Sequence, residues 1–261
     1  MNSKVFLYGS GGTEVDLKEL GIYLKRIFQI EPELRGDFFS YFGSDSEHIA
    51  ERIAELRVVD ISKPFRKNEP FPLEVKLEKE IIKGKKAPGL LYDGFYFMDF
   101  MRDIIPEKER RNFHLYITDR LLGTFDDIDA RYHARTIILG YPCIVSTSGI
   151  VEAPAKPREY YIEKGLLKSV DELIRLKENY RSRFIDYGDR RMQKVVEGYS
   201  ATAVFYHYLG EVFCTSKKCR LYNAHWQEEL IEAQLSEPEF CTEHEEMREL
   251  PLAEGNFPPK S

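Results

Sequence analysis

The chain has 261 residues, enough for one large domain or two small ones with a proper hydrophobic core. Its formal net charge of -6 comes without a dense basic face, which argues against a nucleic-acid-binding protein. The N-terminus opens into a strand-like segment rather than a signal peptide, and no apolar run could span a bilayer. Three of the four cysteines are candidate zinc ligands, which indicates a reducing interior rather than a disulfide framework, so we expect a cytoplasmic protein without a membrane partner.

The N-terminal part of the sequence alternates strand-like and helix-like segments. Residues 4–8 form a buried strand, and residues 13–28 have apolar side chains near helical spacing, with Thr13 as the expected cap. Residues 37–42 read as a second strand and residues 44–56 as a second helix, capped by one of its first two residues. This β-α-β-α order predicts an α/β layer with at least one parallel pair of strands.

The turn after the first strand contains Gly9, Gly11 and Gly12. Their spacing fits neither the phosphate loop of nucleotide hydrolases nor the dinucleotide-binding fingerprint. A plain strand-to-helix turn is therefore the better interpretation.

The next segments predict a loop, two helices and a strand. Residues 62–75 are rich in proline and charge and should form a loop, while residues 76–86 should form a solvated helix. Residues 94–105 are strongly aromatic and predict a buried helix, and residues 113–118 predict a central strand.

The segment at residues 124–135 carries the aspartates Asp126, Asp127 and Asp129. A calcium loop would also need a glycine and a downstream glutamate, both of which are absent, so we predict a polar loop rather than a cation site. His133 in the same segment is expected to be a satisfied histidine at a strand edge.

Two further strands are predicted at residues 135–140 and 142–148, and Cys143 in the second should be a core residue rather than a metal ligand. Residues 146–157 are small, polar and proline-rich, which is typical of an exposed edge or a binding loop. Residues 158–183 should then be helical.

A long helix is predicted at residues 190–209, ended by Gly210. The order of segments is strands mixed with helices, followed by a helical final third. We expect an N-terminal mixed α/β part at residues 1–189 and a smaller C-terminal subdomain at residues 190–261.

The C-terminal part contains two closely spaced pairs of soft metal ligands. Cys214 and Cys219 are separated by four residues, and Cys241 and His244 by two. Pairs on two tight turns that fold against each other are what a tetrahedral zinc site needs. The residues around both pairs are polar, which disfavours the alternative of cysteines buried as small apolar side chains. The spacing therefore predicts one structural zinc ion.

The same stretch resembles the archaemetzincin branch of the metzincin metallopeptidases. That family has the motif HExxHxxGxxH, followed at once by Cys-x4-Cys, then a methionine and later FC-x2-C. The chain matches these features, with histidine in place of the last cysteine, at His207, Gly210, Cys214, Cys219, Phe240, Cys241 and His244. The resemblance implies a twisted mixed sheet with flanking helices, a long active-site-type helix whose end faces a substrate cleft, and a structural zinc on the four ligands.

The resemblance also shows what the chain lacks. Aligned through Gly210, the positions of the first histidine and the glutamate are occupied by Ala203 and Val204, and the third-ligand position by Phe213. The methionine position falls at Leu221. Only His207 remains, and one histidine without the neighbouring glutamate provides neither a tight metal site nor a base for water. A second, catalytic zinc is therefore not expected.

Two alternatives would retain catalysis. His207 and Glu211 are four residues apart, so a relocated metal site could combine them with His225. The simpler interpretation is that Glu211 is an exposed residue after the helix and that His225 caps the next helix. Ligands could instead come from His133 or from the aspartates at residues 126–129.

Over most of its length the chain also resembles an uncharacterised group of archaeal metallopeptidase-like proteins, through segments such as YITDRLLGTFDD and YNAHWQEELIEAQ. Our first hypothesis is a zinc-stapled pseudo-peptidase that binds a peptide or protein between residues 146–155 and the helix carrying His207. The residues expected along that groove are Arg131, His133, Glu152, Tyr206 and His207. Alternatives are a working hydrolase with a non-standard metal site and an adaptor that docks through its zinc module.

Overall fold

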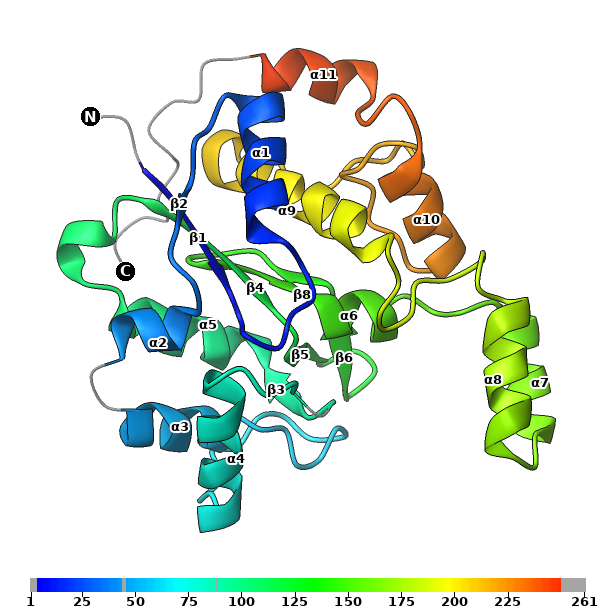
Figure 1. The fold of residues 1–261 in the computed structure, drawn as a ribbon, viewed down its shortest axis with the longest axis horizontal. Helices are drawn as coiled ribbons and strands as arrows, with labels where there is room; N and C mark the ends of the chain where they lie inside the picture. The colour runs from blue at the N-terminus through cyan, green and yellow to red at the C-terminus, as the bar shows by residue number, and fades with distance from the viewer. Residues whose placement is uncertain (1–3, 44–45, 88, 250–261) are drawn as a thin grey trace.

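The computed structural model of the protein describes residues 4–43, 46–87 and 89–249. A five-stranded sheet lies at its centre, with helices on both faces (Figure 1). The strands, in spatial order, are β2 (Glu33–Leu34), β1 (Val5–Gly9), β4 (Phe113–Thr118), β8 (Cys143–Ser146) and β7 (Ile137–Ile138). Four of them run parallel and β7 pairs antiparallel with β8 at the edge. The predicted α/β class with a mixed sheet is confirmed.

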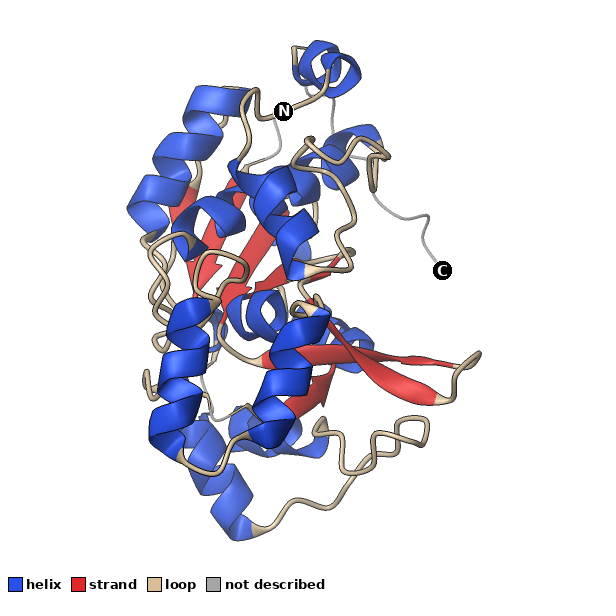
Figure 2. Ribbon diagram, turned by 90° about the vertical axis from the view of Figure 1, so that its right-hand side faces the viewer, coloured by secondary structure: helices blue, strands red, loops and turns tan. Residues whose placement is uncertain are grey.

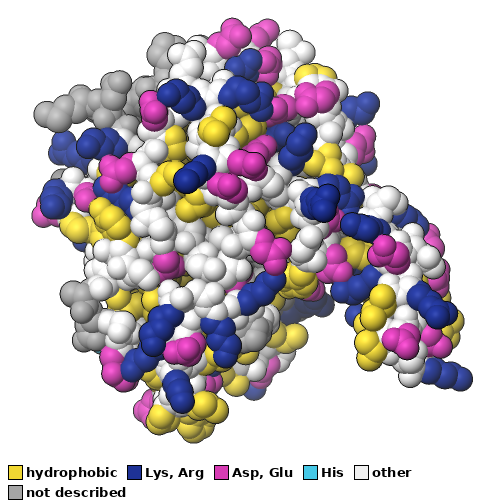
Figure 3. Space-filling model, viewed as in Figure 1, with side chains coloured by type: hydrophobic (Ala, Val, Ile, Leu, Met, Phe, Trp, Pro, Cys, Tyr) yellow, Lys and Arg dark blue, Asp and Glu magenta, His cyan; other side chains and the backbone are white. Residues whose placement is uncertain are grey.

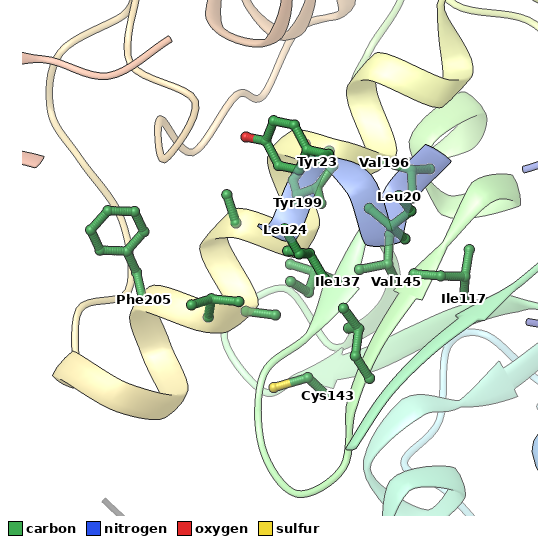
Figure 4. Packing of buried hydrophobic residues seen from close by; sticks show 14 of the residues in the cluster. Leu20, Tyr23, Leu24, Ile117, Ile137, Cys143, Val145, Val196, Tyr199 and Phe205 are labelled. Carbon is green, nitrogen blue, oxygen red and sulfur yellow. The ribbon is translucent and has the colours of Figure 1, made fainter. Parts of the chain in front are cut away.

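One face of the sheet is covered by the long helix α9 (Met192–Leu209) and by α1 (Leu17–Phe28). Apolar side chains of both helices meet the sheet, as Figure 4 shows for Leu24, Val145 and Tyr199. The helices α10 (Gln227–Leu235) and α11 (Thr242–Arg248) follow α9 on this side (Figure 1).

The opposite face is covered by α2 (Phe38–Phe42), α3 (Ser46–Glu55), α4 (Pro72–Ile82) and α5 (Gly94–Ile104), followed by a short 3-10 helix at Glu107–Glu109. This layer has a core rich in aromatic rings, in which Phe39 contacts the rings of Phe97, Phe100 and Tyr116. The predicted helix at residues 94–105 is confirmed.

A buried ion network ties α4 to the sheet. The carboxylate of Glu78 is fully buried and accepts hydrogen bonds from the guanidinium groups of Arg57 and Arg120 and from the hydroxyl of Tyr92. Arg120 lies between β4 and β5 and is itself 1% exposed. Buried charges persist only when they are paired in this way, so the network fixes how α4 sits against the sheet.

A second sheet contains β3 (Leu91–Asp93), β5 (Leu121–Asp126) and β6 (Arg131–Arg135). Figure 2 shows β5 and β6 as a long hairpin that extends from the body. The predicted polar loop at residues 124–135 is therefore wrong outside its turn. The aspartates lie at the turn, where Asp126 accepts the N–H of Ile128, while the flanking residues pair as antiparallel strands.

Residues 37–42, predicted as a strand, form helix α2, because Asp37 caps the backbone N–H of Ser40 and two consecutive phenylalanines pack into the core. The structure also differs from the prediction at residues 146–157, for which the sequence predicts an exposed edge or binding loop. Ser146 caps the helix α6 (Thr147–Glu152) by accepting the N–H of Gly149, and most of this helix is buried. In both places a capping side chain decided the structure.

Several predicted boundaries move by a few residues. Helix α1 begins after Asp16, whose carboxylate caps it, rather than after Thr13. Helix α4 begins at Pro72, inside the segment predicted as a loop. The caps proposed at Ser44 and Asp45 lie outside the described residues. Gly210 ends α9 in the left-handed conformation, as predicted, with φ of 75°.

The helices α7 (Arg158–Leu166) and α8 (Val170–Asn179) form a hairpin that projects from the body (Figure 1). It has its own small aromatic core, and Figure 3 shows apolar side chains on its surface among charges of both signs. Both ends of the hairpin are tied to the buried Gln227, whose backbone N–H donates to Ala155 and whose side chain accepts the N–H of Ile185. The division at residues 189 and 190 stays a prediction. No described helix is long and apolar enough to cross a membrane.

Candidate functional site

The four predicted metal ligands converge after the end of α9. The ligand atoms of Cys214, Cys219, Cys241 and His244 all lie within 4.8 Å of one another. The sulfurs of Cys214 and Cys241 are 3.8 Å apart, and Nδ1 of His244 is 3.1 Å from the sulfur of Cys241 and 3.9 Å from that of Cys219. A tetrahedral ion with sulfur ligands at about 2.3 Å separates its sulfurs by roughly 3.8 Å.

Local backbone structure holds each pair of ligands. Cys214 donates its N–H to the carbonyl of Leu221, and its sulfur accepts the N–H of Ser216 at 3.3 Å. Cys241 is the N-cap of α11 and His244 lies in the first turn of that helix, so their side chains share one face. The ring of His244 packs edge-on against Phe205 of α9. The cluster thus joins the end of the chain to its longest helix.

The chemistry of these ligands fits zinc. All four cysteines of the chain are free thiols, and three of them meet here without forming a disulfide. Burial raises the pKa of the Cys219 thiol to about 12, so this group resists ionisation unless a cation compensates the charge. A bound zinc ion provides that cation and ligates the thiolates directly. Cys143, by contrast, is fully buried beneath the sheet's helical layer and joins no ligand group, as predicted.

The face of α9 that carries Ala203, Val204 and His207 is part of the hydrophobic core. Ala203 and Val204 are fully buried, and the His207 ring stacks on Phe113 of β4 with ring centroids 4.5 Å apart. Burial lowers the pKa of His207 to about 4, and nearby His114 acts in the same direction. The imidazole of His207 is therefore neutral at pH 7 and contributes to packing rather than to an open site.

The proposed relocation of a metal site to His207, Glu211 and His225 is not formed in the described part of the chain, where no group of three ligands contains any of them. His225 is exposed and precedes α10, which instead has Trp226 at its cap position. A second group of three does occur at the β5–β6 turn. Asp126, Asp129 and His133 have ligand atoms within 4.8 Å of one another, and His133 hydrogen-bonds to Asp129.

A cleft of about 380 Å³ lies between the β6–β7 segment and the loops of the C-terminal part. One wall comes from residues 133–139, and the facing wall from Ala153, Pro154, Phe213 and residues 223–225. Phe213, at the third-ligand position of the archaemetzincin motif, is 41% exposed and faces this space. The end of α9 thus leads to a cleft, as the resemblance implied, although the other motif positions do not line it.

The strand β7 is the open edge of the main sheet along this cleft. Its neighbour β8 pairs Ile138 with Ile144, and Ser146 donates its N–H to the carbonyl of Thr136. Hydrogen-bonded and non-hydrogen-bonded pairs alternate in an antiparallel ladder. The N–H and C=O of Ile137 therefore point away from β8, toward the cleft, where they can pair with another extended chain.

Of the five residues predicted to line the substrate groove, His133 alone lines this cleft. Tyr206 and His207 pack into the core. Glu152 bonds to the hydroxyl of Tyr187, and Arg131 lies at the far end of β6 beside Asp129. Glu152 and Arg131 lie elsewhere because α6 and the β5–β6 hairpin replace the predicted loops, whereas Tyr206 and His207 lie on faces of α9 that pack against the core.

The sequence interpretation missed Arg135, Thr124 and Asn223 as cleft residues. The sequence does contain a pattern that identifies Arg135. Alternation along β6 places Arg131, His133 and Arg135 on one face of the strand, opposite the buried Tyr132.

Comparison with known proteins agrees with the resemblance in the sequence. A family model described as "Probable metallopeptidase family (DUF6775)" matches residues 1–250. The chain belongs to this family. No curated protein matches it. Among solved structures, a zinc-dependent peptidase from Methanocorpusculum labreanum is similar, with 12% identity, a TM-score of 0.41 and coverage of 94% of this chain and 98% of that one. Archaemetzincin from Methanopyrus kandleri has 11% identity, a TM-score of 0.36 and coverage of 94% and 93%.

For a member of the Probable metallopeptidase family, the cleft lining is short of the groups that hydrolysis needs. It contains His133 and His225 on opposite walls and no Asp or Glu. A zinc peptidase needs three ligands around an open coordination position and a carboxylate that takes a proton from the attacking water. Among the described residues, four possible metal ligands meet in the Cys3His cluster and three, Asp126, Asp129 and His133, meet at the β5–β6 turn.

Proposed function

We propose that this protein holds one zinc ion in the Cys3His cluster as a structural staple and binds an extended peptide segment along β7. The observation that supports the binding role is the open strand edge beside a cleft, where the backbone groups of Ile137 face outward. Addition of a strand to a sheet edge is a common way of binding peptides: main-chain hydrogen bonds supply affinity and neighbouring pockets supply specificity.

The same geometry supports binding without the ancestral hydrolysis. Ala203 and Val204 are buried in the core, and His207 stacks on Phe113, so no metal ligands from α9 reach the cleft. The free cysteines support a reducing compartment, for which we propose the cytoplasm.

One observation favours a second candidate function, that of a hydrolase with a non-standard metal site. His133 both lines the cleft and belongs to the group with Asp126 and Asp129. A metal ion on these three side chains would lie beside bound peptide. Activity that requires added metal and disappears in His133→Ala, with Cys3His zinc content unchanged, would support this candidate over the first.

Peptide binding can be tested with a pooled library of eight-residue peptides amidated at the C-terminus, with retained peptides identified by mass spectrometry. Each retained peptide is then resynthesised with a single N-methyl group at each position in turn. Pairing with Ile137 uses the N–H and C=O of one peptide residue, so methylation at that residue should weaken binding more than methylation at either neighbour, whose N–H points away. Uniform effects along the peptide, or no retained peptide, would contradict binding at the strand edge.

Hydrolysis is followed in the same samples. Retained peptides are incubated with zinc-loaded protein and with protein given additional zinc, and their masses are recorded over time. We expect intact peptides in both. Cleavage that a chelator abolishes would replace the binding proposal with the hydrolase.

A further inference from the structure

The cleft differs in charge from the rest of the molecule. The chain has 44 acidic and 38 basic residues, yet the cleft lining contains Arg135 and two histidines and no carboxylate. In the β5–β6 turn, Asp129 hydrogen-bonds to His133 and lies beside Arg131. An acidic protein with a cleft lined on one side by a cation has a local preference for anionic groups.

Arg135 is held in place at the beginning of the open strand edge. Its Nε donates to the hydroxyl of Thr124 at 2.7 Å, and this neutral partner leaves the charge of the guanidinium uncompensated. Within the described part of the chain, Arg135 takes part in no ion pair. Its terminal nitrogens remain available as a two-pronged donor for a carboxylate.

The backbone at Arg135 is also fixed. Gly149 of α6 packs so closely that a Cβ atom there would lie 1.9 Å from the carbonyl oxygen of Arg135. The next residue, Thr136, accepts a hydrogen bond from Ser146. Both contacts come from the main sheet and its helix, so the guanidinium stands at a set position two residues before Ile137.

We propose that Arg135 selects peptides that carry a carboxylate, either an acidic side chain or a free C-terminus, beside the segment that pairs with Ile137. This inference rests on the proposed peptide binding and adds the chemical class of the ligand. A peptide strand antiparallel to β7 places its C-terminal residues near the start of β7, where Arg135 lies. The apolar side of the cleft, formed by Phe213, Pro154 and Ile138, then contacts the uncharged residues of the peptide.

The test uses three matched forms of the eight-residue peptide pool with the intact, zinc-loaded protein. The first form is amidated and contains glutamine at one fixed position near the C-terminus. The second replaces this glutamine with glutamate, and the third keeps the glutamine but has a free C-terminal carboxylate. Fluorescence anisotropy of the retained peptides gives their affinities for wild type, Arg135→Gln and Arg135→Lys.

A charge-assisted bidentate contact should make at least one carboxylate form bind about tenfold more tightly to wild type than the amidated glutamine form. Arg135→Gln should reduce this preference to within about twofold, while Arg135→Lys should keep part of it. The control is Arg131→Gln, on the same face of β6 but outside the cleft, which should keep the full preference.

The possible failures are distinguishable. If wild type binds all three forms equally, or if Arg135→Gln keeps the preference, the carboxylate inference is overturned while peptide binding stands. If wild type binds none of the three, the proposed function fails and this inference fails with it. The glutamate and free-terminus forms separate the two sources of the carboxylate.

Discussion

The Cys3His cluster and the buried face of α9 lie next to each other in sequence and in space, but the first brings possible metal ligands together and the second is packed core. Cys214 lies five residues after Leu209, the last residue of the helix, and the four ligand atoms of its cluster lie within 4.8 Å of one another. On the helix, Ala203, Val204 and His207 form packed core. Under the proposed function, the contrast teaches that a structural metal site is separable from a catalytic one, because metal binding at the first contributes folding energy by itself.

The largest effect should come from breaking the cluster. Cys241→Ser removes a thiolate ligand, and we expect loss of zinc together with more than about 5 kcal/mol of stability or unfolding of the C-terminal part, since zinc binding here is folding energy. Metal analysis and thermal unfolding with and without chelator would measure this. Cys143→Ala is the matched control, because that cysteine is buried outside the cluster and its loss should leave the zinc content unchanged. A melting curve that does not change in chelator would refute the proposed structural zinc.

The buried face of α9 can be tested by introducing the glutamate of the archaemetzincin motif. Val204→Glu places a carboxylate in a fully buried position, and we expect a loss of about 3–5 kcal/mol in the free energy of unfolding. Neither a second zinc nor hydrolysis should appear, even together with Ala203→His. Acquisition of a second metal without loss of stability would show that this face can open.

The pH dependence of stability should report the burial of His207. Its pKa is about 4 in the folded protein and about 6.5 for an unperturbed histidine, so the unfolded chain binds the proton more readily between these values. Its contribution is therefore complete above about pH 6.5 and is lost as the pH falls toward 4, up to about 3 kcal/mol.

His207→Phe preserves the ring stack on Phe113 and removes this titration, so the variant should lose less stability than wild type between pH 6.5 and pH 4 in urea unfolding. The buried His114, whose pKa burial also lowers to about 4, remains in the variant, so part of the slope should persist. His225→Gln changes an exposed histidine and should unfold with the wild-type pH dependence. Identical slopes for wild type and His207→Phe would place His207 outside the core.

The smallest effect concerns the wall that supports the cleft. Gly149→Ala introduces a Cβ that would overlap the backbone of Arg135, so α6 or β6 must shift, and we expect a loss of about 2 kcal/mol with weaker peptide binding. Gly165→Ala, in α7 with no atom within 4 Å of the added Cβ, should stabilise the protein by up to about 1 kcal/mol through helix propensity. Equal effects of the two substitutions on peptide binding would show that α6 does not support the wall of the cleft.

Much of the fold and the metal cluster was predictable because short-range chemistry determines both. The spacing of Cys214, Cys219, Cys241 and His244 is a local property, and so is the stop signal at Gly210. The cleft was predictable only in part. Its location depends on β7 being an edge strand and on α6 being buried, and both follow from long-range packing that a single sequence does not display.

Capping residues account for the largest local errors. Asp37 and Ser146 were read as parts of strands or loops, yet each accepts a backbone N–H and begins a helix. A polar residue at either position fits a strand or loop as well as a helix cap until tertiary contacts decide between them. The hairpin at residues 121–135 was misread for the opposite reason, because its aspartate-rich turn dominated the composition of two genuine strands.

The buried network of Arg57, Glu78 and Arg120 has a consequence for the protein's response to heat. The hydration of charged groups becomes less favourable as temperature rises, so the cost of removing these three groups from water falls on warming. The attraction between Glu78 and the two guanidinium groups is shielded from solvent. It therefore does not weaken on warming as much as the cost of removing these groups from water falls. The joint between α4 and the main sheet is therefore better suited to a warm environment than to a cold one.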